Sequence, residues 1–144
     1  MTGMEQRVES TRRKVLCIPG YDYSTPGSYF VTICASDRLS RFSTVSEDGL
    51  YLTPAGSKVE LSWMDLPTRF PGVEVDEFVA MPDHLHGILW LIAEDMDAGR
   101  VSLGKVIQAY KSLTTKHYIN GVRNQGWPSF AGRLWQPNYY EHII

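Results

Sequence analysis

The sequence has little cysteine, no long hydrophobic run and almost no net charge. Its 144 residues include two cysteines, Cys17 and Cys34, whose separation fits no metal-binding or redox motif, so we expect a protein of a reducing compartment, the cytoplasm. Its apolar runs are far shorter than the roughly 20 residues that cross a bilayer, and the polar segment 1–10 does not resemble a signal peptide. These absences predict a soluble protein with no membrane partner.

The charge is nearly balanced but unevenly distributed. A formal net charge of −2 argues against a protein that coats nucleic acid through overall charge alone. Positive residues nevertheless cluster at Arg12, Arg13 and Lys14 and recur in the C-terminal third, whereas acidic residues crowd 74–97. Taken alone, this pattern is typical of a solvated mixed surface.

The composition is that of one globular domain. Hydrophobic residues make up 43% and charged residues 21% of the chain, without repeats or low-complexity segments. A chain of this length buries about two thirds of its unfolded surface in a single core. The polar, basic segment 1–19 predicts an extended N-terminal arm, and the turn-rich segment 19–27 leads into a domain that occupies 20–144.

The pattern of apolar residues predicts four strands and two helices. Residues 28–35 are dense in β-branched and aromatic side chains, as in a buried strand, and Thr53 followed by Pro54 is typical of a helix N-terminus. The last segment contains Pro137 and is therefore expected to be an edge or bent strand. The predicted strands are 28–35, 73–81, 85–92 and 134–144, the predicted helices are 53–66 and 102–121, and a loop is expected around 37–49.

This order of elements predicts an α+β, ferredoxin-like (RRM-like) fold. Strand, helix, strand, strand, helix, strand is the split βαβ arrangement, an antiparallel sheet with two helices on one face. The second and third strands form a hairpin through Pro82 and Asp83, and alternation predicts one shared face for the odd-numbered positions of 73–81. The other face of the sheet is expected to be open for a ligand.

The most specific motif is MPDHLHGI, residues 81–88, at the start of the second hairpin strand. Side chains two residues apart on a strand lie on the same face, so His84 and His86 project together while Leu85 enters the core. Since the leucines of this strand suit the face that meets the helices, the histidines are expected on the open face. Two imidazoles in this arrangement can bind one metal ion; a hydrogen-bonded structural pair is the alternative.

Four segments, in order, resemble the HUH single-strand DNA transposases with one catalytic tyrosine, and within them the REP-associated tyrosine transposases. The signature is histidine, a bulky apolar residue and histidine, here on a predicted central strand. The segments are RRKVLCIPGYDYSTPGSYFVTICASDR (12–38), MPDHLHGI (81–88), LGKVIQAYKSLTTKHYI (103–119) and LWQPNYYEHII (134–144). Together they extend over nearly the whole chain.

The resemblance implies a metal-dependent reaction on DNA. His84 and His86 would bind Mg²⁺ or Mn²⁺ at the scissile phosphate of single-stranded DNA beside a hairpin or palindromic element. A tyrosine then attacks, forming a 5′-phosphotyrosyl bond and releasing a 3′-OH, so that strands are nicked and joined. The metal polarises a phosphoryl oxygen, and the covalent intermediate conserves the bond for rejoining. A hard cation prefers oxygen, so a third ligand is required besides the two imidazoles.

The nucleophile is where this sequence departs from the family pattern. The family's last strand is followed by a helix that carries the tyrosine and, one turn later, a polar metal ligand, whereas this sequence ends at Ile144. Three interpretations follow: a truncated enzyme, a tyrosine within the chain as substitute, or a DNA or RNA hairpin-binding module that does not cut. Tyr140 is the better substitute because it shares a polar face with His142; Tyr110 is more simply a core aromatic.

Two further questions stay open on the residues alone. His142 either supports the site or caps the sheet. A metal-dependent hydrolase unrelated to DNA would need a carboxylate near the histidines, for which Asp83 is the candidate.

Several basic and aromatic residues are candidates for DNA contacts. They are Arg12, Arg13, Lys14, Tyr21, Tyr23, Lys105 and Lys111. The first three form a basic arm that can follow a nucleic-acid backbone, and the two tyrosines can stack on unpaired bases. The two lysines lie on the second predicted helix and suit phosphate contacts, although lysines on such a helix commonly serve solubility alone. The resemblance is compatible with a monomer or a homodimer.

Overall fold

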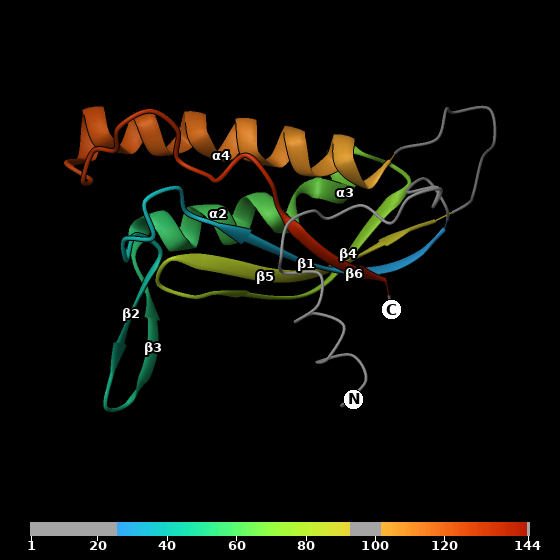
Figure 1. Ribbon diagram of the computed structural model, residues 1–144, viewed down its shortest axis with the longest axis horizontal. Helices are drawn as coiled ribbons and strands as arrows, with labels where there is room; N and C mark the ends of the chain where they lie inside the picture. The colour runs from blue at the N-terminus through green and yellow to red at the C-terminus, as the bar shows by residue number, and fades with distance from the viewer. Residues whose placement is uncertain (1–25, 93–101, 144) are drawn as a thin grey trace.

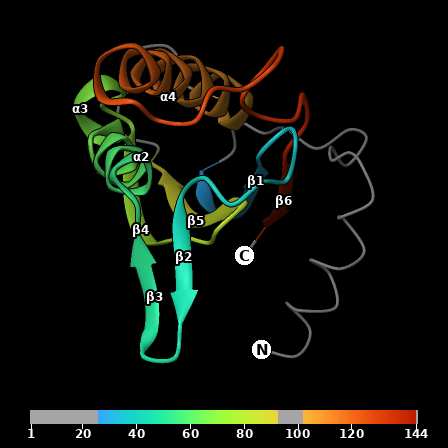
Figure 2. The same ribbon diagram turned by 90° about the vertical axis from the view of Figure 1, so that its left-hand side faces the viewer.

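A four-stranded antiparallel sheet forms the centre of the molecule, and helices pack against one of its faces (Figures 1 and 2). The computed structural model describes residues 26–92 and 102–143. In spatial order the strands are β4 (Val73–Ala80), β5 (His84–Leu91), β1 (Gly27–Cys34) and β6 (Tyr140–Ile143). The helices are α2 (Pro54–Met64), α3 (Leu66–Arg69) and α4 (Leu103–Gln125). This architecture confirms the predicted α+β, ferredoxin-like fold, with the histidine motif at the start of a central strand.

Both predicted helix starts are confirmed. The Thr53 hydroxyl accepts a hydrogen bond from the Gly56 amide at the start of α2, and the Ser102 hydroxyl caps α4 in the same way. α2 ends at Met64, and the short α3 carries Pro67 in its first turn, where a proline costs no hydrogen bond.

The predicted end of the second helix near residue 121 was wrong, because Gly121 lies inside α4. A Cβ atom at this position would lie 2.1 Å from Trp127 Cε3, so the glycine allows the indole ring to pack directly on the helix. α4 continues to Gln125 and is followed by Gly126 in the left-handed conformation (φ 73°), a common helix cap.

A hairpin occupies most of the segment that was predicted to be a loop, so this prediction was wrong. β2 (Ser43–Ser46) pairs with β3 (Gly49–Leu52), and the two strands project as an arm on the side of the sheet away from the helices (Figures 1 and 2). Each strand has only four residues, and their side chains are mostly exposed, so the usual alternation of buried and exposed positions is absent. The turn signal was present in the Asp48-Gly49 pair, where Gly49 has a positive φ of 140°.

A β-bulge in β4 overturns the predicted single face for residues 73–81. The register shifts between Val75 and Phe78, so that Val79 pairs with His86 and is 42% exposed, while Ala80 is buried. One extra residue on one strand reverses the side of every later side chain. Val79 therefore lies on the face opposite the helices.

The core lies between the sheet and the helices. The Trp63 ring meets Tyr110 edge-on, with ring centroids 5.4 Å apart, and covers Gly87, where a Cβ would approach to 2.5 Å. The buried Tyr110 hydroxyl donates to the Val59 carbonyl, as expected for a core aromatic, and burial raises its pKa. In the part of the chain that the structure describes, no helix is both long and apolar enough to cross a membrane.

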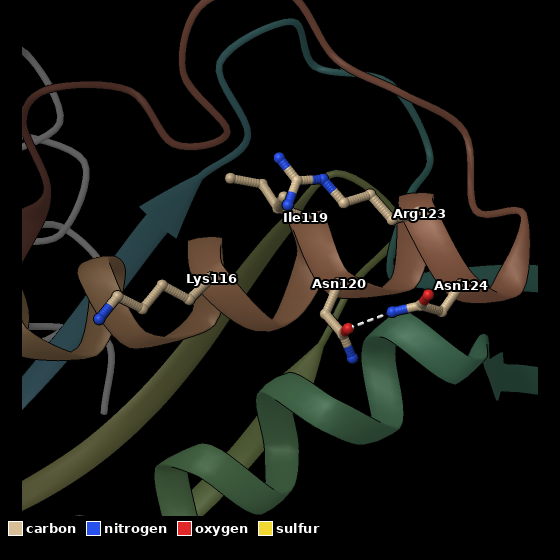
Figure 3. A pocket seen from close by; sticks show the side chains of 5 residues that line it. All are labelled: Lys116, Ile119, Asn120, Arg123 and Asn124. Atoms are coloured by element: carbon tan, nitrogen blue, oxygen red, sulfur yellow. Dashed lines mark hydrogen bonds between the residues drawn. The ribbon is translucent and has the colours of Figure 1, made fainter.

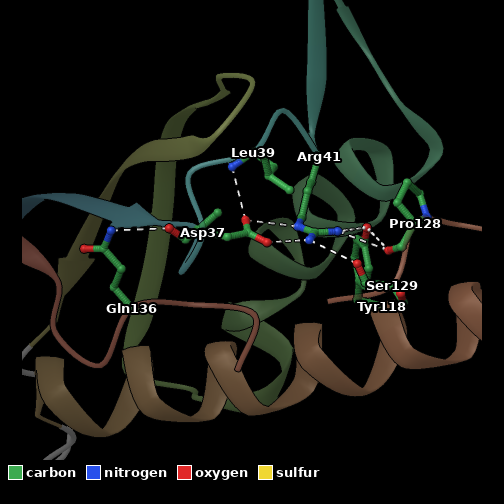
Figure 4. A network of polar contacts seen from close by, with 8 residues as sticks. Asp37, Leu39, Arg41, Tyr118, Pro128, Ser129 and Gln136 are labelled. Atoms are coloured by element: carbon green, nitrogen blue, oxygen red, sulfur yellow. Dashed lines mark hydrogen bonds and ion pairs between the residues drawn. The ribbon is translucent and has the colours of Figure 1, made fainter. Parts of the chain in front are cut away.

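A buried arginine anchors the segment between β1 and β2 (Figure 4). The Arg41 guanidinium donates to the Tyr118 hydroxyl, to the carbonyls of Pro128 and Ser129, and to the Asp37 carboxylate. The hydrogen bond from Arg41 lowers the pKa of Asp37. The network joins this segment to α4 and to the chain beyond it.

The same segment is also attached to the turn that precedes the histidines. The amides of Arg41 and Phe42 both donate to the Pro82 carbonyl, and the Ala35 amide donates to the Asp83 carbonyl. Both carbonyls of the 82–83 turn therefore accept hydrogen bonds from the segment between β1 and β2, and these bonds orient the start of β5.

Candidate metal and nucleic-acid site

The two histidine side chains converge on the face of the sheet opposite the helices. His84 Nε2 and His86 Nε2 are 3.2 Å apart, and the rings stand nearly perpendicular, at 80°. Both residues are partly buried at the start of β5, and the intervening Leu85 is fully buried in the core. The two histidines thus lie on one face of the strand and Leu85 on the other, as the motif predicted.

Each ring is oriented by a second hydrogen bond through its Nδ1 atom. Asp83 Oδ1 lies 2.7 Å from His84 Nδ1, and Thr32 Oγ1 lies 2.9 Å from His86 Nδ1. A carboxylate only accepts, so the Nδ1 atom of His84 carries the proton and its Nε2 presents a lone pair when the ring is neutral. Carboxylate and hydroxyl partners of this kind commonly orient metal-binding histidines.

Asp83 is charged at neutral pH. Burial alone would raise the pKa of this carboxyl, but the hydrogen bonds from His84 and Arg38 outweigh it, and the pKa lies below its ordinary value. The charged carboxylate has its two oxygens on two different partners, His84 through Oδ1 and Arg38 through Oδ2.

The spacing of the histidine nitrogens suits two ligands of one ion. Two nitrogens that each lie about 2.1 Å from an ion, about 90–109° apart, are separated by about 3.0–3.4 Å, which includes the observed 3.2 Å. Among the described residues, no group of three or more His, Cys, Asp or Glu side chains is arranged to hold a metal. The pair therefore accounts for two coordination positions and no more.

Tyr140 lies on the same face as the histidines. Cross-strand pairing places Val79, His86, Thr32 and Tyr140 in one row across the four strands, and paired residues share a face. Since neighbouring strands are about 4.8 Å apart, the Cα atoms of His86 and Tyr140 are about 10 Å apart. His142 pairs with Phe30 on this face and is buried.

A hollow of about 340 Å³ adjoins His86. Phe30 forms part of its wall and lies beside the histidine, with ring centroids 5.4 Å apart. Residues of β4 and β5, including Val79 and Ile88, complete it. His86 thus borders a largely apolar recess on this side of the sheet.

Arg38 is a site residue that the sequence did not single out. Its Nε donates to Asp83 Oδ2 at 2.9 Å, while its side chain stays 54% exposed. Arg38 follows β1 in a turn, forty-five positions before Asp83, so only the folded chain brings the two together. A basic residue in a loop carries no local signal of such a partner.

Of the seven predicted DNA-contact residues, the structure describes two, Lys105 and Lys111. The other five, which precede residue 26, lie outside the described residues: Arg12, Arg13, Lys14, Tyr21 and Tyr23. Lys105 is exposed in the first turn of α4. Lys111 donates to three backbone carbonyls at 136–138, and burial, followed by the charge of Arg133, lowers its pKa to about 8. Both lysines belong to the helical layer and not to the histidine face.

Further along α4, a shallow surface hollow carries two exposed basic residues, Lys116 and Arg123 (Figure 3). Asn120 lies between these two residues along the helix, and Asn124 follows Arg123; the two asparagine side chains are hydrogen-bonded to each other. This surface also lies on the helical layer, so it does not extend the histidine site.

Comparison with known proteins places the chain in a family. No protein-family model matches the sequence. It is 33% identical over 143 aligned positions to an uncharacterized protein of Haemophilus influenzae, covering 92% of this chain and 78% of that protein. The chain therefore belongs to the same family as the Haemophilus influenzae protein.

Two solved structures share the fold. A REP-associated tyrosine transposase bound to a REP hairpin is 20% identical, with a TM-score of 0.58, covering 90% of this chain and 62% of that one. The crystal structure of a transposase-like protein of Deinococcus radiodurans R1 is 18% identical with the same TM-score, covering 90% of this chain and 86% of that one. The chain thus has the fold of these transposases and spans less than two thirds of the REP-associated one.

Proposed function

We propose that this chain binds single-stranded DNA beside a hairpin, with the phosphate backbone against the histidine face and Mg²⁺ or Mn²⁺ held by His84 and His86. The observation that carries the proposal is the convergence of two Nε2 atoms at 3.2 Å on the sheet face opposite the helices. The shared fold supports it, because the REP-associated transposase was solved with a REP hairpin bound.

The chain's own residues prepare this site before any ion binds. Asp83 and Thr32 hold the two rings so that both Nε2 atoms face one point, which removes the entropic cost of ordering them. When bound, the ion would polarise a phosphoryl oxygen and orient the phosphate. Water and phosphate oxygens would complete its coordination, since a hard cation prefers oxygen.

Metal binding is tested by thermal unfolding and calorimetry with MnCl₂. Manganese at about 100 times its Kd should stabilise the wild-type protein by about 2.7 kcal/mol. His84→Ala and His86→Ala should lose this stabilisation. His117→Ala is the matched control, because His117 lies on α4 in the helical layer and should leave it intact. Equal manganese stabilisation in all four proteins would remove the histidine pair from the proposal.

Tyr140 is the candidate nucleophile for nicking and joining. It shares the face and the cross-strand row of His86, so its hydroxyl can attack a phosphate bound there. The phosphotyrosyl bond forms as the bond from phosphorus to the 3′ oxygen breaks, the tyrosine loses its proton, and the leaving oxygen takes up a proton to become a 3′-OH. With Mn²⁺ and a labelled hairpin that has single-stranded flanks, a covalent adduct should form that survives denaturing electrophoresis. Tyr140→Phe should abolish the adduct and keep DNA binding.

A hairpin-binding module that does not cut is the second candidate function. The separation of about 10 Å between the Cα atoms of Tyr140 and His86 favours it, because the tyrosine must reach across the intervening strand β1. Specific binding of the hairpin without any covalent adduct, in wild-type protein with Mn²⁺ present, would establish this alternative.

A further inference from the structure

Arg38 is held beside the histidine pair by the same carboxylate that orients His84. Asp83 accepts from Arg38 Nε at 2.9 Å through Oδ2 and from His84 Nδ1 at 2.7 Å through Oδ1. The hydrogen bond that Arg38 donates to Asp83 is the main cause that raises the pKa of Arg38, with smaller contributions from nearby Cys34 and Tyr140. The Arg38 guanidinium is therefore close enough to Asp83, Cys34 and Tyr140 to interact with them electrostatically.

The backbone presents Arg38 in a costly conformation. Arg38 has a φ of 57°, the left-handed region, which L-residues other than glycine, asparagine and aspartate adopt rarely. The turn is closed by the Arg38 amide, which donates to the Ala35 carbonyl, and it is attached to the 82–83 turn on both sides. A strained, well-fixed position for an exposed charged residue is a feature that accompanies binding sites.

Arg41, three residues after Arg38, is an arginine with a structural role, and its hydrogen bonds differ from those of Arg38. Arg41 is 6% exposed and uses its terminal nitrogens on Tyr118, Asp37 and two carbonyls. Arg38 uses only Nε, and among residues 26–92 and 102–143 its two terminal nitrogens have no hydrogen-bond acceptor. The planar guanidinium thus retains its phosphate-binding edge while Asp83 fixes its direction.

We infer that Arg38 binds a backbone phosphate of the DNA strand that lies against the histidine pair, with Asp83 as the residue that positions it. The inference rests on the proposed function, because it takes single-stranded DNA as the ligand of this face. Arginine suits the role through paired hydrogen bonds to phosphate oxygens. The carboxylate between Arg38 and His84 makes the anion site and the histidine site one rigid unit.

The test uses the salt dependence of DNA binding. The probe is a fluorescein-labelled DNA hairpin with oligothymidine flanks, and its anisotropy is measured in EDTA between about 50 and 300 mM KCl. Each phosphate contact adds about 0.7 to the slope of log K against log[salt] for a single strand, so Arg38→Asn should lower the slope by about 0.7. Asparagine tolerates the left-handed conformation, so this variant should keep the wild-type melting temperature.

Two further variants separate the charge from its geometry. Arg38→Lys should keep most of the slope but bind more weakly, because an ammonium cannot bond Asp83 and a phosphate in one plane. Arg123→Asn removes an exposed arginine of the helical layer and should leave both the affinity and the slope unchanged. At about 100 mM salt, Arg38→Asn should bind roughly 5-fold to 10-fold more weakly than the wild type.

The outcomes distinguish this inference from the proposed function. Hairpin binding by the wild type with the same slope in Arg38→Asn would overturn the role of Arg38 and leave the proposed function standing. Equal loss in Arg38→Asn and Arg123→Asn would also overturn it, because the effect would then be one of overall charge. Absence of hairpin binding by the wild type would overturn the proposed function, and this inference with it.

Discussion

Strand β5 has two surfaces of different character on alternate residues. Toward the helices, Leu85 and Leu89 are fully buried, and Gly87 lies under the Trp63 ring. On the other face, the strand begins with the partly buried His84 and His86. Asp83 is hydrogen-bonded to His84, and His84 in turn to His86. One strand therefore supplies both stability, through its buried leucines, and a candidate site, whose two rings are oriented by Asp83 and Thr32.

The largest effect on stability is expected from Leu85→Ala. Removing a fully buried leucine leaves a cavity under the helices, so the free energy of unfolding should fall by about 3–4 kcal/mol. His86→Ala changes the adjacent, partly buried residue and should cost about 1 kcal/mol. Urea titration measures both values. Losses of equal size would mean that the two faces of β5 do not separate stability from the site.

A somewhat smaller effect is expected from the buried arginine. Arg41→Met should lower the free energy of unfolding by about 2–3 kcal/mol, because it removes the hydrogen bonds that the guanidinium donates to the Tyr118 hydroxyl and to the carbonyls of Pro128 and Ser129. The Pro128 carbonyl keeps the hydrogen bond from the Tyr118 hydroxyl, which limits the loss. Arg38→Asn should change it by less than about 0.5 kcal/mol, since the lost ion pair is half-exposed and the backbone strain is relieved. Thermal unfolding of the two variants gives the contrast, and similar losses would contradict the different roles assigned to the two arginines.

Lys111, which hydrogen-bonds α4 to residues 136–138, is expected to give an effect that appears only above about pH 8. Its pKa is lowered to about 8 in the folded protein, so the unfolded chain binds more protons than the folded one between about pH 8 and the ordinary value of 10.5. Stability relative to Lys111→Met should therefore rise with pH across that window. Lys105→Met is the control, because Lys105 is exposed. A relative stability that falls over the same window would show that the three carbonyl hydrogen bonds raise this pKa instead.

Much of the fold followed from local patterns. The Thr53-Pro54 and Ser102 signals set both helix starts, and alternation around Leu85 correctly assigned the two histidines to one face. The helix end failed at Gly121, because a glycine looks the same in sequence whether it ends a helix or admits Trp127 to its surface. The difference is a contact with a residue six positions away.

Other features had no strong sequence signal because they depend on pairing between strands. The β4 bulge is defined by its register against β5, and it alone moves Val79 to the histidine face. The β2–β3 hairpin has strands of four residues with little burial, which is too short a pattern for alternation to show. The Arg38 to Asp83 ion pair joins two turns that are distant in the chain.

The order of the elements, the side of β5 on which His84 and His86 lie, and the buried role of Tyr110 could be predicted from local patterns, because they depend on periodicity and on residue type. Three features arise from folding alone: the two Nε2 atoms converge, Asp83 is shared with Arg38, and Lys111 is bonded to the backbone at 136–138. Hydrogen bonds and strand register act between residues that are far apart in the chain, and local propensity carries no information about such pairs.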